Sequence, residues 1–334
     1  MATFASQIFG ALVAARERGY ASGRLGVARL PRPVLSVGNL RVGGSGKTPA
    51  VIALGLACGR AGVRCDVLSR GYRRAHNGMA VALNGNEAVE EVGDEPRLIA
   101  QRLGVPVMVH PDRFRSGLEA ERRFSSQLHL LDDGFQHRQL ARAFDLVLVA
   151  PEDITDRLLP AGRLREPPAA LARADAVAWV DDWHDSQSAP QSALQAARER
   201  LAPWTTAPVF LARKRPVPAA AADITPQHPL AFCGLARPDS FWRTLRQLGI
   251  APAAELAFRD HYHYTVADLR RLRARARAAG ADGFCTTAKD AMNLPHLHPL
   301  HPLRIVEVEM EFADLGGLLH LALTHCGLLG TRPC

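Results

Sequence analysis

The 334-residue sequence predicts an α/β protein with a mostly parallel sheet, a larger first domain and a smaller second domain. Three observations support this class. Short β-rich runs alternate with helical patterns along the chain. Hydrophobic residues make up 47% of the chain and charged residues 22%, which provides apolar cores and excludes a disordered, collagen-like or coiled-coil protein. The length fits two domains of roughly 150 residues each.

The first predicted element is a short N-terminal helix with one apolar face, formed by Phe4, Ile8, Phe9, Leu12 and Val13. The apolar run 8–15 is too short to cross a bilayer, and no basic residue precedes it as in a signal peptide. Arginines follow at once. The helix either lies in a membrane interface beside anionic headgroups or packs on the protein's own core, and both interpretations stay open.

The net charge of +8 favours an anionic partner, such as a nucleotide, a phosphorylated metabolite, a nucleic acid or a membrane surface. Half of it lies in residues 1–32, where five arginines and one glutamate give +4. Aromatic residues are only 6% of the chain and show no base-stacking pattern, so we expect no nucleic-acid partner. The six cysteines are scattered without a CxxC pair, which indicates reduced thiols in a cytosolic compartment.

Seven strands are predicted in the first domain, with helices between most of them. The strands are Val34–Val37, Val63–Leu68, Val105–Val109, Leu128–Leu131, Leu146–Val149, Ala176–Val180 and Val209–Ala212. The helical stretches include Pro49–Arg60, Glu95–Leu103 and Arg115–Phe124.

Residues 214–229 hold four prolines and an alanine run, and they are the expected linker. Beyond them the alternation of strands and helices restarts, with strands at Leu230–Cys233, Gly283–Thr286 and Arg304–Val308 and helices at Asp239–Leu248, Val266–Ala279 and Leu315–His325. We therefore expect an N-terminal helical region over residues 1–30, a larger domain over 31–215 and a smaller α/β domain over 216–334.

The strongest local signal is a glycine-rich turn between a predicted strand and a predicted helix, over residues 37–48. In this context it predicts a P-loop, in which nucleotide phosphates are held by Gly43, Gly44, Ser45, Gly46, Lys47 and Thr48. Lys47 would reach the β- and γ-phosphates, and the Thr48 hydroxyl suits Mg²⁺. One position departs from the strict pattern, since Arg41 stands where that pattern has glycine.

Two acids, Asp132 and Asp133, follow the apolar strand that begins at Leu128. In a P-loop sheet, a carboxylate at this strand end lies beside Mg²⁺. A turn or helix cap would explain one acid but not the whole run 132–137. Asp94 precedes a predicted helix, and from this motif alone it is most simply an N-cap.

Three further polar segments carry less specific signals. The loop 162–167 can place Arg165 and Glu166 near phosphate and metal, although alone it would be a solvated loop. The histidines within 260–265 favour a general base beside a carboxylate, because no second cluster at metal spacing appears. Residues 286–290 follow a strand and either contact a ligand or cap a helix, whereas the arginines over 270–277 predict a solvated helix face.

Eight segments fall in one order along the chain: 37–49, 69–72, 92–96, 132–137, 162–167, 232–236, 260–261 and 286–290. Together they resemble the tetraacyldisaccharide 4′-kinase family, the membrane-bound kinases of lipid A biosynthesis. The resemblance extends from about residue 4 to residue 312. It implies ATP- and Mg²⁺-dependent transfer of the γ-phosphoryl group to the 4′-hydroxyl of a tetraacyldisaccharide 1-phosphate, giving lipid IVA. It also implies a peripheral enzyme whose N-terminal helix docks on the anionic cytoplasmic face of a Gram-negative inner membrane.

On the matching positions, the resemblance assigns Asp132, Asp133 and Glu166 to Mg²⁺ or to the transferring phosphoryl group. It pairs Asp94 with His261 as the device that helps deprotonate the 4′-hydroxyl, which replaces the N-cap interpretation. The resemblance also implies supporting or substrate contacts for Tyr72, Gln136, His137 and Arg165.

Two positions depart from the family pattern. Ala288 stands where the family usually has glutamate, and Tyr262 stands where a second histidine usually follows the first. We therefore expect His261 to be the active histidine, with His263 as the alternative. Two other functions remain possible from the residues: a P-loop kinase for a soluble sugar or cofactor precursor, and a P-loop regulatory or chaperone NTPase.

Overall fold

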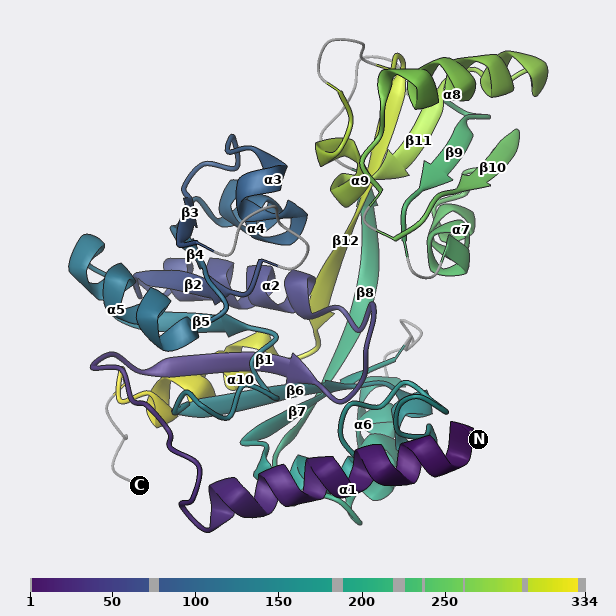
Figure 1. Cartoon of the computed structure of the whole chain (residues 1–334). Coiled ribbons are helices and arrows are strands. Elements are labelled where there is room, and N and C mark those ends of the chain that lie inside the picture. The colour runs from purple at the N-terminus through teal and green to yellow at the C-terminus, as the bar shows by residue number, and fades with distance from the viewer. Residues whose placement is uncertain are drawn as a thin grey trace.

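The computed structural model describes residues 2–71, 78–181, 189–218, 226–235, 238–260, 262–295 and 300–329. Within them, twelve strands form one sheet in the order β10-β9-β11-β12-β8-β7-β6-β1-β5-β2-β4-β3. Figure 1 shows that the sheet extends through two lobes, a first lobe around β1 to β7 and a second lobe around β9 to β11. The predicted α/β class with a mostly parallel sheet is confirmed.

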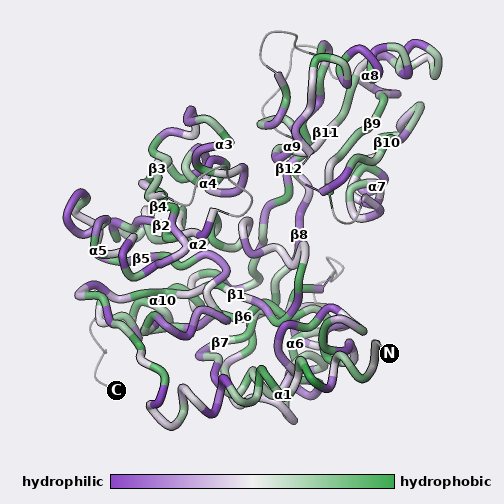
Figure 2. The backbone as a smooth tube through the Cα atoms, in the orientation of Figure 1, coloured by the Kyte–Doolittle hydropathy of each residue, from purple (hydrophilic) through white to green (hydrophobic). Residues whose placement is uncertain are grey.

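The first lobe is a parallel sheet with helices on both faces. Its parallel strands are β1 (Val34–Asn39), β2 (Cys65–Ser69), β4 (Val107–Val109), β5 (Leu128–Asp132), β6 (Phe144–Val149) and β7 (Ala176–Val180). One face is covered by α2 (Lys47–Arg60), α4 (Asp94–Leu103) and α10 (Leu315–His325), and the other by α5 (Arg113–Arg123) and α6 (Ala189–Leu201). Because both faces are covered, these strands are buried along almost their whole length and most of their residues are apolar (Figure 2).

Several short elements of this lobe were not predicted. The edge strand β3 (Ala80–Ala82) pairs antiparallel with β4, and α3 (Val89–Val92) precedes α4. Two 3₁₀ helices, η1 (Pro151–Ile154) and η2 (Pro168–Arg173), follow β6 and precede β7. Each has six residues or fewer, so no hydrophobic period marks it in the sequence.

The N-terminal helix α1 (Ala2–Ala21) lies on the outside of the first lobe (Figure 1). Its contacts with the body include polar ones: the Ser6 hydroxyl donates to the Leu158 carbonyl at 2.9 Å, and Glu17 pairs with Arg138 and Arg173. Its apolar residues Phe4, Ile8 and Leu12 are 68%, 50% and 65% exposed. Packing on the protein's own core is therefore excluded for these three side chains. No described helix is both long and apolar enough to span a membrane.

Two ten-residue strands, β8 (Val209–Pro218) and β12 (Leu303–Phe312), connect the lobes. The first residues of β8 pair with β7, the first residues of β12 pair with β11, and between these pairings the two strands pair only with each other, antiparallel. We call residues 213–218 and 306–311 the ribbon. The expected linker over 214–229 is thus wrong for residues 214–218, which continue β8, and the expected domain boundary near 215 falls inside a strand.

The second lobe repeats the α/β pattern on a smaller scale. Its parallel strands are β9 (Leu230–Cys233), β10 (Ala254–Ala257) and β11 (Phe284–Thr287), with helices α7 (Pro238–Gln247), α8 (Val266–Ala278) and α9 (Ala288–Met292). Of these, β10 and α9 were not predicted. Four arginines of α8, at 270, 271, 275 and 277, are exposed, so the predicted solvated helix face is confirmed.

Candidate active site

The predicted P-loop joins β1 to α2 at the carboxyl edge of the parallel sheet. Gly43 and Gly46 have φ angles of +89° and +94°, a conformation that glycine adopts without strain. Gly46 is the residue before the first turn of α2, and a Cβ atom there would collide with the Met310 side chain and lie 3.1 Å from the Lys214 side chain, both on the ribbon strands. The loop therefore ends at a helix N-terminus, where free N–H groups attract anions.

Arg41, the departure from the strict loop pattern, turns away from solvent and into the first lobe. It is only 4% exposed, and its guanidinium pairs with Glu152 at 2.6 Å and Asp153 at 3.1 Å. Among the described residues, positive φ outside glycine occurs only at Asp133, so the backbone at position 41 needs no glycine.

Lys47 lies in a compact charged cluster with residues from three other segments. Its ammonium is 3.5 Å from the Asp133 carboxylate and donates to the Asn39 side-chain oxygen at 3.3 Å. Arg165 donates to both oxygens of Asp133, at 2.7 and 3.0 Å, and also to Asn39. Burial alone would raise the pKa of Asp133, but Lys47 and Arg165 hold it well below the usual range. Asp133 is therefore a permanent anion that orients two cations.

Asp132 has the opposite environment. It is buried and accepts a hydrogen bond from the Ser69 hydroxyl at 3.3 Å. Burial, with the negative charges of Glu95 and Asp133, raises the pKa of Asp132 to about 7, against the opposing effect of Lys47. A carboxylate with excess negative charge around it at the edge of a phosphate loop fits a divalent cation. Thr48, the other predicted ligand on this side, is buried at the start of α2.

Glu166, the third predicted metal residue, is fully buried beneath α1 and has arginine partners. Its carboxylate lies 2.7 Å from Arg173 and 3.8 Å from Arg16. Arg173 in turn lies 4.5 Å over the Phe135 ring. These are the contacts of an ion pair that holds the loop 162–167 under the N-terminal helix. Among the described residues, no group of three or more His, Cys, Asp and Glu side chains could form a metal centre.

Gln136 and His137, the predicted supporting residues, lie in the turn after Asp133. The Gln136 amide donates to the Asn39 carbonyl at 2.9 Å, so it fixes the strand end that precedes the P-loop. Burial and the nearby charges of Arg113 and Arg142 lower the pKa of His137 to about 4, so its imidazole is neutral at pH 7.

Asp94 is not an N-cap: it is the first residue of α4, and the cap position is held by Gly93 at φ +90°. It is 6% exposed, and its carboxylate accepts from the Glu95 N–H at 2.9 Å. The same helix end contacts the second lobe, because Glu95 pairs with Lys289 of α9 and α4 packs on α9. Burial would lower the pKa of Lys289, but Glu95 and Asp94 raise it, so both acids lie within electrostatic reach of this ammonium.

Asp290 holds the loops of the second lobe together. Its carboxylate accepts from the Gly234 N–H at 2.7 Å, from the Tyr264 hydroxyl at 2.8 Å and from the Thr287 hydroxyl at 2.5 Å. Thr287 also caps α9, so the capping interpretation of residues 286–290 is confirmed. Gly234 lies against the backbone of residue 259 and the side chain of Tyr262, which brings segment 258–264 to the same strand edge.

Two predicted residues, Tyr72 and His261, lie outside the described residues. Of the neighbours of His261, Tyr262 packs against Phe258 and Tyr264 and its hydroxyl donates to Asp268 at 3.2 Å. Tyr262 therefore completes an aromatic cluster where the family usually has histidine. His263, the alternative active histidine, is exposed.

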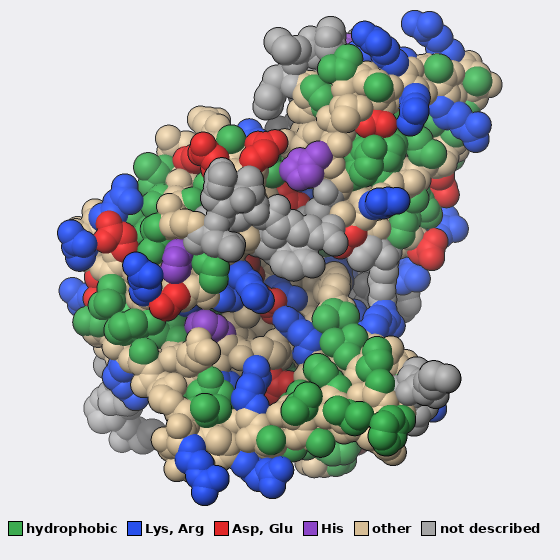
Figure 3. Space-filling view, viewed as in Figure 1, with side chains coloured by type: hydrophobic (Ala, Val, Ile, Leu, Met, Phe, Trp, Pro, Cys, Tyr) green, Lys and Arg blue, Asp and Glu red, His purple; other side chains and the backbone are tan. Residues whose placement is uncertain are grey.

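Sequence reasoning missed several charged residues that share this edge. Arg113, the first residue of α5, is buried, and desolvation together with Arg70 lowers its pKa to about 10, while Asp133 and Asp132 oppose the shift. Glu95, Lys289 and Asn39 were likewise not singled out. Their positions in the sequence could have identified them, because each lies at the end of a strand or at the start of a helix. In parallel α/β sheets, ligands bind at this edge. Figure 3 shows Lys and Arg side chains gathered in the hollow between the lobes.

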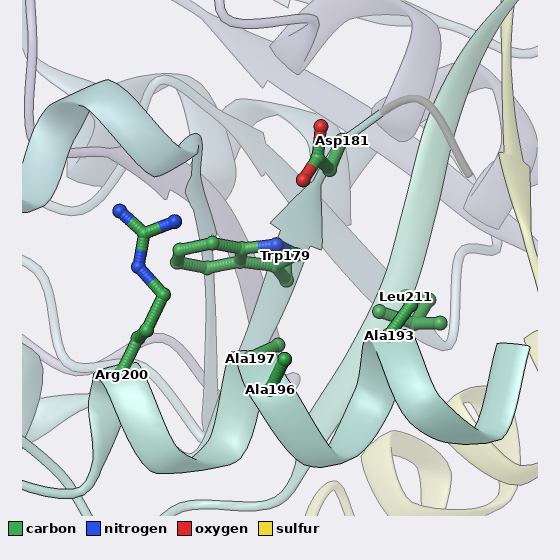
Figure 4. Close-up of a pocket in the computed structure, with 7 residues that line it drawn as sticks. All are labelled: Trp179, Asp181, Ala193, Ala196, Ala197, Arg200 and Leu211. Atoms are coloured by element: carbon green, nitrogen blue, oxygen red, sulfur yellow. The ribbon is translucent and has the colours of Figure 1, made fainter. Parts of the chain in front are cut away.

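A small pocket lies elsewhere, between β7, β8 and α6 (Figure 4). Trp179 and alanines of α6 line it, and the Arg200 guanidinium lies 5.1 Å from the Trp179 ring centre. None of the predicted site residues belongs to its lining.

A phosphate loop at the edge of a parallel sheet, with a loop lysine held by a strand-end carboxylate, defines a P-loop nucleotide enzyme. The comparisons with known proteins specify the class further. Residues 2–324 match the family model described as tetraacyldisaccharide-1-P 4′-kinase. The chain therefore belongs to the tetraacyldisaccharide-1-P 4′-kinase family.

Individual relatives agree with the family model. The chain is 41% identical over 323 residues to the tetraacyldisaccharide 4′-kinase of Koribacter versatilis, covering 94% of this chain and 95% of that protein. It is 37% identical over 311 residues to the enzyme of the same name from Geobacter metallireducens, covering 90% of each. The crystal structure of "apo" form LpxK from Aquifex aeolicus in complex with ATP superposes with a TM-score of 0.74, at 30% identity and 96% coverage of both chains. The predicted resemblance and the predicted kinase class are confirmed.

Proposed function

We propose that this chain transfers the γ-phosphoryl group of ATP to the 4′-hydroxyl of a tetraacyldisaccharide 1-phosphate, giving lipid IVA, with Mg²⁺ and at a membrane surface. The observation that supports it best is the cluster of Lys47, Asp133 and Arg165 at the P-loop of a chain that belongs to this kinase family. The relatives from Koribacter and Geobacter carry the name of this activity.

Phosphoryl transfer requires in-line positioning and neutralisation of charge, with little covalent chemistry from the protein. Lys47 and Arg165, both oriented by Asp133, supply two cations beside the loop's N–H groups. Thr48 and Asp132 would hold Mg²⁺ together with the phosphates, because both present side-chain oxygens, at the start of α2 and at the end of β5. When bound, the metal ion neutralises charge on the phosphate oxygens. Glu166 serves this site by holding the loop that carries Arg165.

Removal of the acceptor proton is assigned to Asp94 and His261. Asp94 is buried at the start of α4, on the side that contacts Lys289 of the second lobe. Residue 261 follows segment 258–260, which Gly234 and Asp290 fix at the strand edge of that lobe. A carboxylate from one lobe and an imidazole from the other would therefore meet between the lobes, where the carboxylate orients the imidazole as a base.

The lipid acceptor requires access to a bilayer, and α1 supplies a suitable surface. Phe4, Ile8 and Leu12 form an outward apolar stripe at four-residue spacing, and arginines follow it in the sequence. We assign the enzyme to the cytoplasmic face of the inner membrane, where ATP is available, as a peripheral protein. The larger domain over 31–215 then presents ATP, and the smaller domain over 216–334 closes on it and excludes water.

The test is incubation of the protein with γ-labelled ATP and tetraacyldisaccharide 1-phosphate in mixed micelles, followed by chromatography of the lipids. We expect label in a lipid that carries one additional phosphate. A matched acceptor with its 4′-hydroxyl blocked should remain unlabelled, and Lys47→Met should transfer nothing. Release of labelled phosphate without labelled lipid would support a regulatory NTPase instead. Labelling of soluble sugars without detergent would support a soluble-substrate kinase.

A further inference from the structure

A second lysine, Lys214, contacts the P-loop from outside the loop's own sequence. It lies on the ribbon, in register opposite Met310 of β12. Its ammonium donates to the Gly44 carbonyl at 2.6 Å in a solvent-exposed hydrogen bond, and the residue as a whole is half-buried. The loop is thus joined to the strand pair that connects the lobes, 170 residues further along the chain.

Lys214 contacts the Gly44 carbonyl oxygen, and the direction of this carbonyl fixes the direction of the Ser45 N–H. The Gly44 carbonyl belongs to the same peptide unit as the Ser45 N–H, and the two groups point in opposite directions across a trans peptide. A phosphate cradle needs its N–H groups inward, so its carbonyls must find donors outside the cradle. An ammonium at 2.6 Å is such a donor, and a charge-assisted hydrogen bond is stronger than a neutral one.

The ribbon contacts the loop at a second point. A side chain at Gly46 would collide with the methyl group of Met310 and lie 3.1 Å from the Cε atom of Lys214. Both ribbon strands therefore pack on the last glycine before α2. In the structure the Ser45 N–H donates to the Gly43 carbonyl at 2.7 Å, so this donor must change partner when a phosphate binds. Lys214 holds the carbonyl of the same peptide, so this N–H can pass from the Gly43 carbonyl to a phosphate oxygen while the Gly44 carbonyl stays outward.

We propose that Lys214 is a positioning residue for the ATP phosphates, which holds the Gly44 carbonyl outward so that the loop's N–H groups face the phosphate chain. The proposal rests on the assigned kinase function and adds a residue on the ribbon to the phosphate site. Because Lys214 belongs to the ribbon, the conformation of the P-loop depends on the position of the ribbon relative to the loop.

The test compares Lys214→Met with Arg215→Met. Arg215 is the next residue on the same strand and pairs instead with Glu309 and Glu311 on the surface, so both variants remove one positive charge from the ribbon. Binding of ATP and of inorganic triphosphate is measured by calorimetry. We expect Lys214→Met to weaken both at least about 10-fold, as for loss of a hydrogen bond to a charged group. Arg215→Met should bind both as the wild type does. Wild-type affinity of Lys214→Met for triphosphate would overturn the proposal.

Two further measurements separate positioning from general stability. Lys214→Met should raise the KM for ATP and leave the KM for the lipid acceptor unchanged, and Lys214→Arg should restore most of the affinity for triphosphate. If Lys214→Met lowers the Tm without nucleotide, Lys214→Gln replaces it, because glutamine keeps a donor without the charge. Lys214→Gln should bind triphosphate more weakly than the wild type, and equal affinity would contradict the proposal. Failure of the wild type itself to bind ATP would instead count against the proposed function.

Discussion

Asp132 and Asp133 are neighbours in sequence with opposite electrostatic environments. Lys47 and Arg165 outweigh the burial of Asp133 and hold its pKa well below the usual range, whereas burial, together with the negative charge of Glu95, raises the pKa of Asp132 to about 7. Asp133 has a positive φ of 53°, and it is the first residue after β5, which ends at Asp132. One acid orients cations and the other is suited to receive one. Pairs of acids with divergent pKa values are typical of active sites.

Asp94 and His261 are the residues proposed to remove the acceptor proton. Asp94→Asn and His261→Ala should each lower kcat by about 10²–10⁴-fold, the usual contribution of a positioned base. The double variant should be no slower than the worse single variant, because the two residues act as one unit. Asp239→Asn, an exposed acid of the second lobe, is the control. Fully additive losses, measured in single-turnover assays, would refute the pairing.

His129 gives a prediction on pH. Its ring is buried between Asp66 at 2.7 Å and Glu121 at 3.1 Å; burial lowers its pKa, but the two carboxylates outweigh burial and raise it. A raised pKa stabilises the fold fully below the unfolded value of about 6.5, and this stabilisation is lost as pH rises through the folded pKa. In urea unfolding, the stability difference between wild type and His129→Gln should therefore shrink from pH 6 to pH 9. A constant difference would contradict this assignment.

Single residues also show where sequence reasoning reached its limit. The loop residues 43–48 could be placed because glycine, lysine and threonine at this spacing have one well-known geometry. The partners of Arg41 and Glu166 could not, since each pairs with a residue whose position depends on the packing of distant loops. The motif alone favoured an N-cap role for Asp94. Only the family resemblance led to the correct prediction that Asp94 is not the N-cap of α4.

Among the elements, α1 carries an exposed apolar stripe that a buried helix would not have (Figure 3). The triple variant Phe4→Ser, Ile8→Ser and Leu12→Ser should weaken binding to anionic vesicles by at least about 10-fold, because each apolar side chain buried in a bilayer contributes about 1.5 kcal/mol or more. ATP affinity should be unchanged. The control is Leu56→Ser, Leu83→Ser and Leu118→Ser, three leucines elsewhere on the first lobe that are 38–40% exposed. Unchanged vesicle sedimentation of the α1 variant would refute the docking role.

Most of the long helices and strands could be predicted from the period of their hydrophobic residues. The exception is the end of β8, which was predicted as a linker. The end of β8 contains Pro216 and Pro218, which favoured a linker over a strand. The two prolines are two residues apart, so their missing N–H groups lie on one side of the strand. In the ribbon that side has no partner strand, since β7 pairs only as far as Ala212. Prolines at this spacing are therefore compatible with one strand of a two-stranded ribbon as well as with a linker.

For the whole molecule, the arrangement predicts closure. The lobes are connected by the ribbon and touch where α4 meets α9, through Glu95 and Lys289. Binding of a non-hydrolysable ATP analogue together with the lipid acceptor should reduce the radius of gyration measured by X-ray scattering, because the two halves of the proposed base must meet. Lys47→Met, which lacks the phosphate anchor, should show no reduction. An unchanged radius for the fully liganded wild type would contradict closure.

The ribbon has a consequence for synthesis of the chain. The second lobe is inserted between β8 and β12, and the chain returns to complete the first lobe with Phe312, Leu318 and Leu323, which are buried in the same core as Leu54 of α2. A nascent polypeptide on the ribosome therefore makes the whole inserted lobe before the core of the earlier one can close. Until α10 emerges, α2 and the nucleotide loop that precedes it lack part of their apolar support, so the growing chain acquires its catalytic loop among the last parts of the molecule to become stable.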